Sequence, residues 1–307
     1  METRRIGSLD ASVVGLGCNN FGARTDAAGT ARVVDAALDA GINFFDTADI
    51  YSKGVSEELL GRALGPRRSR ILIASKFGHE MDEQRRGARP EYVRRAVEDS
   101  LRRLGTDVID LYQLHKPDAS VPIADTLGAL DELVRAGKVR EIGCSNFSVD
   151  QLREAEEAVR GGGARFVSVQ NEYSLIRREP EQDGVLAECE RTDVAFIPYF
   201  PLASGLLTGK YRRGAPVPTD TRIGEGGRYG SLLSEQNLEI VERLIGFAEG
   251  RGHTILDLAF SWLLARPAVA SVIAGATRPE QVHANAAAAG WKLTADELRE
   301  VDALLAA

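Results

Sequence analysis

Residues 27–51 read AAGTARVVDAALDAGINFFDTADIY, and this stretch contains one unit of the fold that the sequence predicts. Its first part, 27–40, carries apolar residues at helical spacing and is followed by Gly41, a residue that suits the end of a helix. The next part, 43–47, is centred on the adjacent residues Phe44 and Phe45 and shows no alternation of apolar and polar residues. Such a run is typical of a parallel strand that is covered on both faces. The stretch therefore predicts an α/β fold.

The same alternation of short apolar runs and helical stretches continues along the chain. Eight runs are predicted to be strands: 13–17, 43–47, 71–76, 108–115, 141–145, 166–171, 195–199 and 270–275. Helices are predicted at 27–40, 56–64, 90–104, 125–136, 150–160, 181–191, 235–249 and 279–288, with an additional C-terminal helix at 294–307. Eight strand–helix units are typical of a closed parallel barrel with right-handed crossovers. We therefore predict a single (β/α)8 TIM barrel that forms one domain over residues 1–307.

An open, doubly wound sheet is the competing fold. That fold usually carries G-x-G-x-x-G after its first strand. Here the first strand leads into Gly15 and Gly17, but the next glycine, Gly22, lies too far along the chain for this pattern. The phosphate-binding pattern G-x-x-x-x-G-K-[ST] does not occur in the sequence either. The barrel is therefore favoured.

Two segments interrupt the alternation. Residues 81–89 are polar and are predicted to form a loop after the third strand. Residues 209–231 are rich in glycine, proline and arginine. Long irregular segments of compact domains are often lids or binding loops. We expect residues 209–231 either to cover part of a binding site or to form a disordered surface excursion.

Charge and cysteine content limit the partners and the location that we expect. Lys and Arg total 38 and Asp and Glu total 45, and the net charge of −7 argues against a general nucleic-acid or membrane-surface binder. Three scattered cysteines, Cys18, Cys144 and Cys189, fit a reducing compartment. The N-terminal residues lack a signal-peptide core, and no apolar run is long enough to span a bilayer. We expect a cytoplasmic protein, and its oligomeric state stays open.

Three consecutive predicted strands end in residues that carry chemistry. The second ends at Asp46, the third at Lys76 and the fourth at His115, while Tyr51 lies on the loop that follows Asp46. Active sites of β/α barrels lie at the carboxyl ends of the strands, so these side chains are expected at one rim. Each residue alone is explained as well by a helix cap, a packing residue or a structural histidine. Together they predict an active site. The four histidines show no metal-ligand spacing, and no metal site is predicted.

These four residues are suited to protonating a carbonyl oxygen. The ordinary pKa of tyrosine is about 10. A lysine cation beside Tyr51 favours the phenolate and so makes the tyrosine a better acid. Asp46 would hold Lys76 charged and in place. His115 would donate a hydrogen bond to the carbonyl oxygen and fix the angle of the substrate.

The same residues belong to a longer series of motifs. In chain order these are D-T-A-x-x-Y at 46–51, S-E at 56–57, S-K at 75–76 and L-H at 114–115. The series resembles the aldo-keto reductase superfamily, and the resemblance extends over essentially the whole chain. Residues 7–17 resemble the amino-terminal β-hairpin and first strand of that family. The resemblance implies a barrel that uses NADPH/NADP+ without a Rossmann domain. The implied catalytic tetrad is Asp46, Tyr51, Lys76 and His115.

The resemblance also implies where the cofactor would bind. Ser145, Asn146 and Gln170 would hydrogen-bond the nicotinamide carboxamide, and Tyr199 would stack on its ring. Locally, Ser145 and Asn146 are explained as well by capping the helix that follows. The full set of implied cofactor-binding residues is Gly17, Cys18, Asp46, Ser145, Asn146, Gln170, Tyr199, Phe200, Leu202, Ser204, Gly205, Lys210, Gly275, Thr277, Arg278, Gln281 and Asn285.

The predicted preference for NADP(H) over NAD(H) depends on Arg278. A guanidinium there suits the 2′-phosphate. Gln281 stands where relatives often have arginine, so Arg278 would carry this contact alone. Phe200 replaces a common serine near the pyrophosphate, which puts one side-chain contact in doubt. The residues around Lys210 match a loop that covers the pyrophosphate in some branches of the family.

We expect a small aldehyde or ketone as substrate, reduced to an alcohol with Tyr51 as proton donor. The substrate pocket is predicted from proximity in the sequence to include Asn20, Ile50, Phe77 and Lys116. Two other functions are compatible with part of these residues. A Schiff-base aldolase that uses Lys76 would leave the cofactor-binding residues without a joint role. A cofactor-binding regulatory or sensor protein with little turnover would resemble potassium-channel β subunits, but the complete tetrad favours an enzyme.

Overall fold

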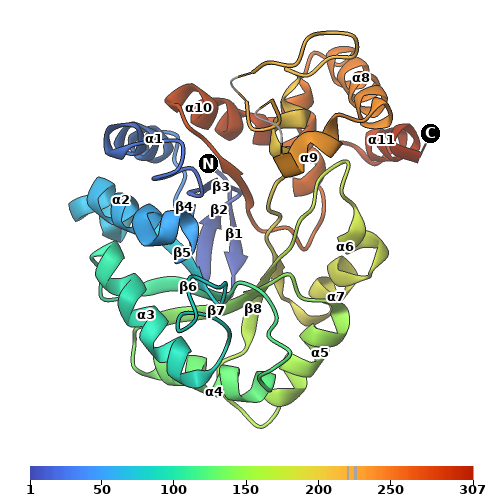
Figure 1. The fold of residues 1–307 in the computed structure, drawn as a ribbon. Helices are drawn as coiled ribbons and strands as arrows, with labels where there is room; N and C mark the ends of the chain where they lie inside the picture. Colours follow the sequence, from blue (N-terminus) through green and yellow to red (C-terminus); the bar gives the residue numbers. More distant parts are fainter. Residues whose placement is uncertain (220, 225–226, 307) are drawn as a thin grey trace.

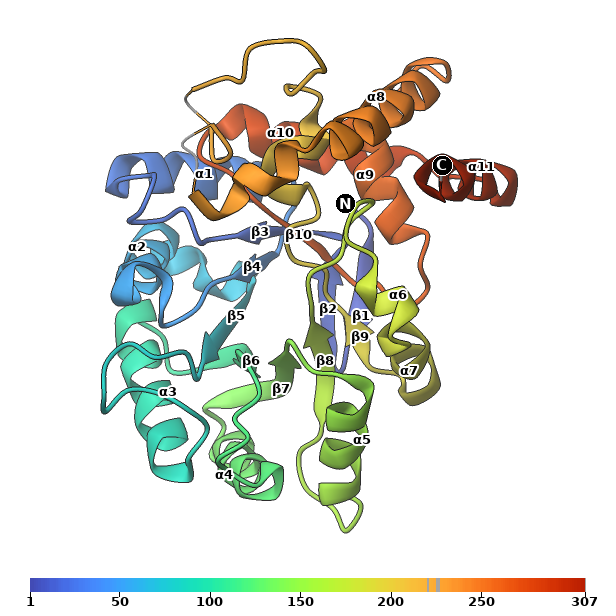
Figure 2. The ribbon, with the colours of Figure 1, turned by 45° about the vertical axis from the view of Figure 1, so that its right-hand side comes forward.

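A closed barrel of parallel strands forms the centre of the computed structural model, which describes residues 1–219, 221–224 and 227–306. Its strands are β3 (Val14–Gly17), β4 (Phe44–Asp46), β5 (Leu72–Phe77), β6 (Ile109–Leu114), β7 (Val139–Ser145), β8 (Phe166–Gln170), β9 (Ala195–Phe196) and β10 (Val272–Gly275). Neighbouring strands are parallel and follow the order β10-β3-β4-β5-β6-β7-β8-β9. The two edges are joined by hydrogen bonds from Ala270 N to Phe196 O (3.0 Å) and from Ile273 N to Pro198 O (3.4 Å). The predicted barrel is therefore confirmed, and helices surround it (Figures 1 and 2).

Both faces of the barrel strands are buried, which explains their continuous apolar sequence. All six residues of β6 are buried, for example. One face packs against the surrounding helices. The other face contributes to a separate inner cluster that includes Phe44, Leu111 and Ile273. Successive residues of one strand therefore point alternately into the barrel and toward the helices.

A β-hairpin fills one end of the barrel. Strands β1 (Thr3–Ile6) and β2 (Leu9–Ser12) pair antiparallel, as the resemblance implied. Ile6 and Leu9 are fully buried and belong to the inner cluster of the barrel. The turn of the hairpin is held by a hydrogen bond from Ser8 N to Glu141 Oε1 (2.7 Å). The hairpin thus supplies the apolar floor of the barrel, opposite the carboxyl ends of the strands (Figure 1).

Most helices lie where the sequence predicts them. They are α1 (Ala27–Asp39), α2 (Val55–Leu64), α3 (Pro90–Leu104), α4 (Ile123–Arg135), α5 (Val149–Ala158), α8 (Glu235–Glu249), α10 (Pro279–Ala287) and the additional C-terminal helix α11 (Ala295–Ala306). The single helix predicted at 181–191 is wrong. It is divided into α6 (Glu179–Gln182) and α7 (Val185–Thr192) because Gly184 adopts a left-handed conformation, with φ of 80°.

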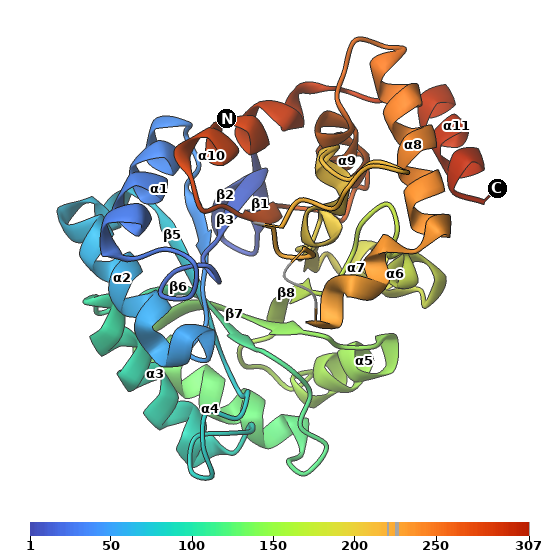
Figure 3. The same ribbon diagram turned by 45° about the horizontal axis from the view of Figure 1, so that its top comes forward.

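Helix α9 (Ile255–Leu264) was not predicted. Its sequence, ILDLAFSWLL, is apolar on nearly every side, and Trp262 is completely buried. An amphipathic pattern is therefore missing, because the helix packs inside the structure between its neighbours (Figure 3). A usable signal precedes it: Thr254 and Asp257 form a reciprocal capping box, with Asp257 N donating to Thr254 Oγ1 (3.2 Å) and Thr254 N to Asp257 Oδ2 (2.8 Å).

The irregular segment 209–231 reaches back to the connection between β3 and α1. Arg222 Nη2 donates a hydrogen bond to Asn20 Oδ1 at 2.7 Å. Positions 220, 225 and 226 of this segment lie outside the described residues. Within the described part of the chain, we find no helix with the length and apolar character needed to cross a membrane.

Candidate active site

Strands β4 and β5 bring Asp46 and Lys76 together at their carboxyl ends. Lys76 Nζ donates to Asp46 Oδ1 at 2.5 Å and to the Thr47 carbonyl oxygen at 2.8 Å. It also donates to the Tyr51 hydroxyl at 3.3 Å. Lys76 is 0% exposed and Asp46 2% exposed, so the ion pair is shielded from water. A continuous chain of contacts therefore runs from Asp46 through Lys76 to Tyr51.

Two side-chain amides hold the second carboxylate oxygen of Asp46. Gln170 Nε2 donates to Asp46 Oδ2 at 2.9 Å, and Gln113 Nε2 donates to it at 3.4 Å. Gln113 was not among the predicted site residues. The feature that could have indicated Gln113 is its polar side chain within the buried strand β6, because a buried polar side chain needs a hydrogen-bond partner. The two amides fix the orientation in which Asp46 meets the lysine.

Tyr51 is presented by a strained turn. It begins a 3-10 turn (Tyr51–Gly54) in which Ser52 and Lys53 have φ of 49° and 55°. Such left-handed conformations are costly for residues other than glycine. Ser52 Oγ donates to Phe21 O at 3.1 Å, which anchors the turn to the connection after β3. The position of the phenol is thus set by its backbone as well as by Lys76.

The acidity expected for Tyr51 needs correction. Burial raises the pKa of Tyr51, and this effect outweighs the lowering by the nearby Lys76 cation. Burial also acts to lower the pKa of Lys76, but Asp46 and Tyr51 beside it more than compensate, so its pKa is raised. The lysine is therefore charged and the phenol protonated near neutral pH, which is the state that a proton donor requires.

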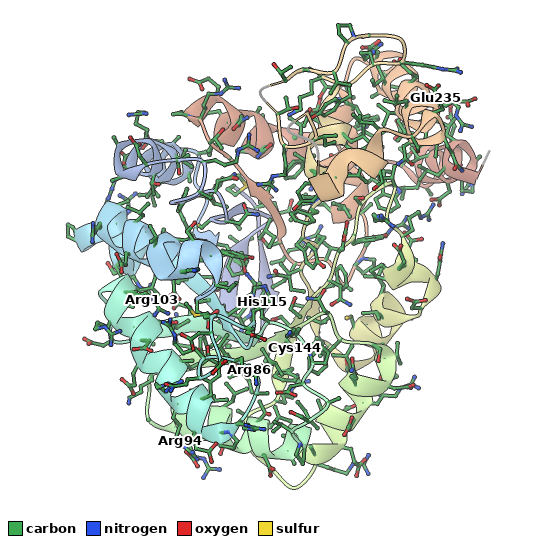
Figure 4. The ribbon with its side chains drawn as sticks, viewed as in Figure 1. Arg86, Arg94, Arg103, His115, Cys144 and Glu235 are labelled. Atoms are coloured by element: carbon green, nitrogen blue, oxygen red, sulfur yellow. The ribbon has the colours of Figure 1, made fainter. Side chains whose placement is uncertain are left out.

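His115 completes the predicted tetrad on the inside of the helix ring (Figure 4). Its ring lies 5.9 Å from the Tyr51 ring, centre to centre, at 81°. Burial, then the positive charge of Lys76 and the neighbouring His79 and Lys116, lower the pKa of His115 well below its ordinary value. The ring is thus neutral. Nδ1 is buried without a hydrogen-bond partner among the described residues, which leaves Nε2 to face the cavity.

A cavity of about 950 Å³ opens above these residues. This volume is at the upper end for small-molecule sites. Tyr51, His115 and Asp46 border it, with Lys76 buried beneath. Every residue implied for cofactor binding borders it as well. The described residues that border it and were not predicted include Asn19, Arg24, His79, Thr208, Thr221, Arg222 and Leu256.

Of the four residues predicted for the substrate pocket, two border the cavity and two do not. Asn20 and Ile50 border the cavity. Phe77 does not: it is fully buried and stacks on Tyr112, with ring centres 4.9 Å apart. Because Lys76 points into the barrel, the next residue must point toward the helices. Lys116 also does not border the cavity, and its side chain is exposed.

One end of the cavity carries paired hydroxyl and amide groups. Ser145 Oγ donates to Gln170 O (2.6 Å), and Asn146 Nδ2 donates to His115 O (3.0 Å). Tyr199 donates its hydroxyl hydrogen to Asn146 Oδ1 at 2.8 Å. The alternative that Ser145 and Asn146 only cap the next helix is wrong, because Ser148 caps α5. Hydroxyl and amide groups of this kind suit a carboxamide, which both donates and accepts.

Another part of the cavity is bordered by positively charged side chains. A Cβ atom at Gly275 would lie 3.0 Å from Asn20 Nδ2, so glycine keeps the backbone accessible there. Lys210 and Arg278 border this region, and Arg278 is exposed where α10 begins. The carboxamide of Gln281 accepts hydrogen bonds from the backbone and hydroxyl of Thr277. A dinucleotide with several phosphates fits this donor set.

Comparisons with known proteins identify the family. The model of the Aldo/keto reductase family matches residues 13–306. Aldo-keto reductase YhdN of Bacillus subtilis (strain 168) is 33% identical over 97% of this chain and 91% of its own. Aldo-keto reductase yakc (NADP(+)) of Schizosaccharomyces pombe is 34% identical over 98% of this chain and 90% of its own. The solved glycerol dehydrogenase AKR11B4 from Gluconobacter oxydans superimposes with a TM-score of 0.86 at 34% identity, covering 99% of this chain and 95% of that one. This chain belongs to the aldo/keto reductase family.

Proposed function

We propose that this protein uses NADPH to reduce the carbonyl of a small aldehyde or ketone to an alcohol. The observation that carries the proposal is the chain of contacts from Asp46 through Lys76 to Tyr51 on the wall of a large cavity. Family membership supports an oxidoreductase. The names of two relatives point the same way, since one is designated for NADP(+) and the other is a glycerol dehydrogenase.

The proton would come from Tyr51. Its hydroxyl would donate a hydrogen bond to the carbonyl oxygen and then transfer the proton as charge develops there. Lys76, 3.3 Å away, would stabilise the phenolate that is left. Asp46 keeps that lysine charged inside the barrel. The neutral His115 would donate a second hydrogen bond from Nε2 and so orient the carbonyl.

The cofactor would lie along the cavity from the tetrad to the start of α10. NADPH, when bound, supplies the hydride to the carbonyl carbon. Ser145, Asn146 and Gln170 would hold its carboxamide, and the Tyr199 ring would cover one face of the nicotinamide. Gly275 would leave room for the backbone to approach a phosphate.

Arg278 would set the preference for NADPH. Its side chain is exposed beside the cavity and donates no hydrogen bond to any residue that the structure describes. Gln281 is already engaged with Thr277 and carries no charge. The 2′-phosphate would therefore depend on the guanidinium of Arg278.

The test is titration of the purified protein with NADPH and, separately, NADH, followed by intrinsic fluorescence. A panel of aldehydes and ketones is then added while the absorbance of the reduced cofactor is recorded. Tight NADPH binding with carbonyl-dependent oxidation is the expected result. Binding without turnover would favour the cofactor-sensing alternative. Failure to bind either nucleotide would overturn the proposal.

A further inference from the structure

A second imidazole borders the active-site cavity beside His115. His79 lies two residues beyond the end of β5, on an irregular connection. Its ring meets the His115 ring at 85°, with 4.3 Å between ring centres. The side chain is half-buried. Neither proton transfer by Tyr51 nor the binding of the cofactor uses this residue.

The nitrogens of His79 are available to a ligand. In the described part of the chain, no residue forms a hydrogen bond with the His79 side chain. Unlike Nδ1 of His115, the nitrogens of His79 are not fully buried, and His79 borders the cavity. Burial, followed by the charges of Lys116 and Lys76, lowers the pKa of His79. A neutral imidazole presents one N–H donor and one lone-pair acceptor.

A donor and an acceptor on the same ring favour some substituents over others on the carbon next to the substrate carbonyl. A hydroxyl both donates and accepts, so it matches a neutral imidazole. A carboxylate or phosphate only accepts hydrogen bonds and is bound more strongly by a cationic side chain. A methyl group offers no hydrogen bond. Because His115 would hold the carbonyl oxygen, the ring that contacts it is within reach of a substituent on the adjacent carbon.

We propose that His79 is a specificity-determining residue that binds a hydroxyl on the carbon next to the carbonyl, so that the preferred substrates are α-hydroxy aldehydes and α-hydroxy ketones. This inference rests on the proposed function and names its substrate class. Two pairs of compounds of matched shape isolate the hydroxyl from size: hydroxyacetone with butanone, and 2-hydroxypropanal with 2-methylpropanal. In each pair a hydroxyl replaces a methyl group.

The experiment compares kcat/KM with NADPH for both pairs in the unaltered protein and in variants. His79→Phe keeps a ring against His115 but removes both nitrogens, whereas His79→Gln retains a donor and an acceptor. The control is His253→Phe, because the His253 ring stacks on Trp291 and does not border the cavity. The unaltered protein should prefer the hydroxylated member of each pair. His79→Phe should reduce that preference by roughly tenfold, the effect of one lost hydrogen bond, chiefly through KM.

His79→Gln should restore part of the preference, and His253→Phe should leave it unchanged. Equal losses for both members of a pair in His79→Phe would mean that the ring only supports His115, and would overturn the inference. So would an unaltered protein that shows no preference. These results leave the proposed function standing, since they require turnover. If none of the four compounds is reduced although NADPH binds, the proposed function fails and this inference with it.

Discussion

Removing one partner of the buried Asp46–Lys76 ion pair should destabilise the protein more than removing both partners. Both side chains are shielded from water, and their charged atoms are 2.5 Å apart. In Lys76→Met, the Asp46 carboxylate would still accept from Gln113 and Gln170. In Asp46→Asn, the Lys76 ammonium would keep neutral acceptors, the Thr47 carbonyl and the amide oxygen of the new side chain, but would lose its counter-charge. Breaking a buried pair costs about 3–5 kcal/mol of unfolding free energy. We expect Asp46→Asn near the upper end of this range and Lys76→Met near the lower end.

The double variant Asp46→Asn/Lys76→Met contains no unpaired buried charge. Its loss of unfolding free energy should therefore be smaller than the sum of the two single losses by at least about 2 kcal/mol. Urea unfolding followed by circular dichroism measures all three values. Turnover should be lost in every variant, so that stability recovers in the double variant and activity does not. Losses that add to within about 0.5 kcal/mol would refute this reasoning, because independent sites behave in that way.

Three further predictions concern single side chains. Tyr51→Phe should lower kcat by roughly 10²–10⁴-fold with little change in the Kd for NADPH, measured by fluorescence, and near-normal turnover would remove Tyr51 as proton donor. Arg278→Ala should weaken NADPH by about tenfold or more and NADH much less in the same titration; equal weakening would exclude a contact with the 2′-phosphate. Burial, and then the charge of Glu57, raise the pKa of Asp49 to about 7. The folded protein thus keeps a proton on Asp49 that the unfolded chain releases near pH 4, so the contribution of Asp49 to the unfolding free energy should fall as the pH rises from about 4 to about 7 and stay level above that. Asp49→Asn lacks this ionisation and should be more stable than the unaltered protein by about 2–4 kcal/mol at pH 8, a difference that vanishes near pH 4. If urea unfolding gives the same difference at both values, Asp49 does not titrate as stated.

Strand-end residues could be predicted because parallel strands fix where their carboxyl ends meet. Asp46, Lys76 and His115 each follow an apolar run, and the barrel places the ends of those runs at one rim. The same geometry also shows why Phe77 was misplaced. Phe77 was assigned to the substrate pocket because it follows Lys76 in the sequence, but consecutive residues of a strand point to opposite faces. The same alternation places Phe77 on the face opposite Lys76 and Gln113 on the same face as His115.

Features that depend on tertiary packing could not be predicted in this way. Helix α9 lacks an amphipathic pattern because its surroundings bury it on nearly all sides. The pKa of Tyr51 depends on how deeply the phenol is buried, and no local pattern records that depth. His79 lies on an irregular connection, where no periodicity indicates the direction of a side chain.

The closure of the barrel also has a consequence for folding kinetics. Val14 pairs with Val272, and Arg4 donates hydrogen bonds to the carbonyl oxygens of Val269 and Leu264. The early and late parts of the chain must therefore meet before the inner cluster is sealed. Contacts of such large sequence separation slow folding. During synthesis, the N-terminal hairpin and the first strands are made before β10. Until β10 has been synthesised, they expose apolar surface through which chains can aggregate.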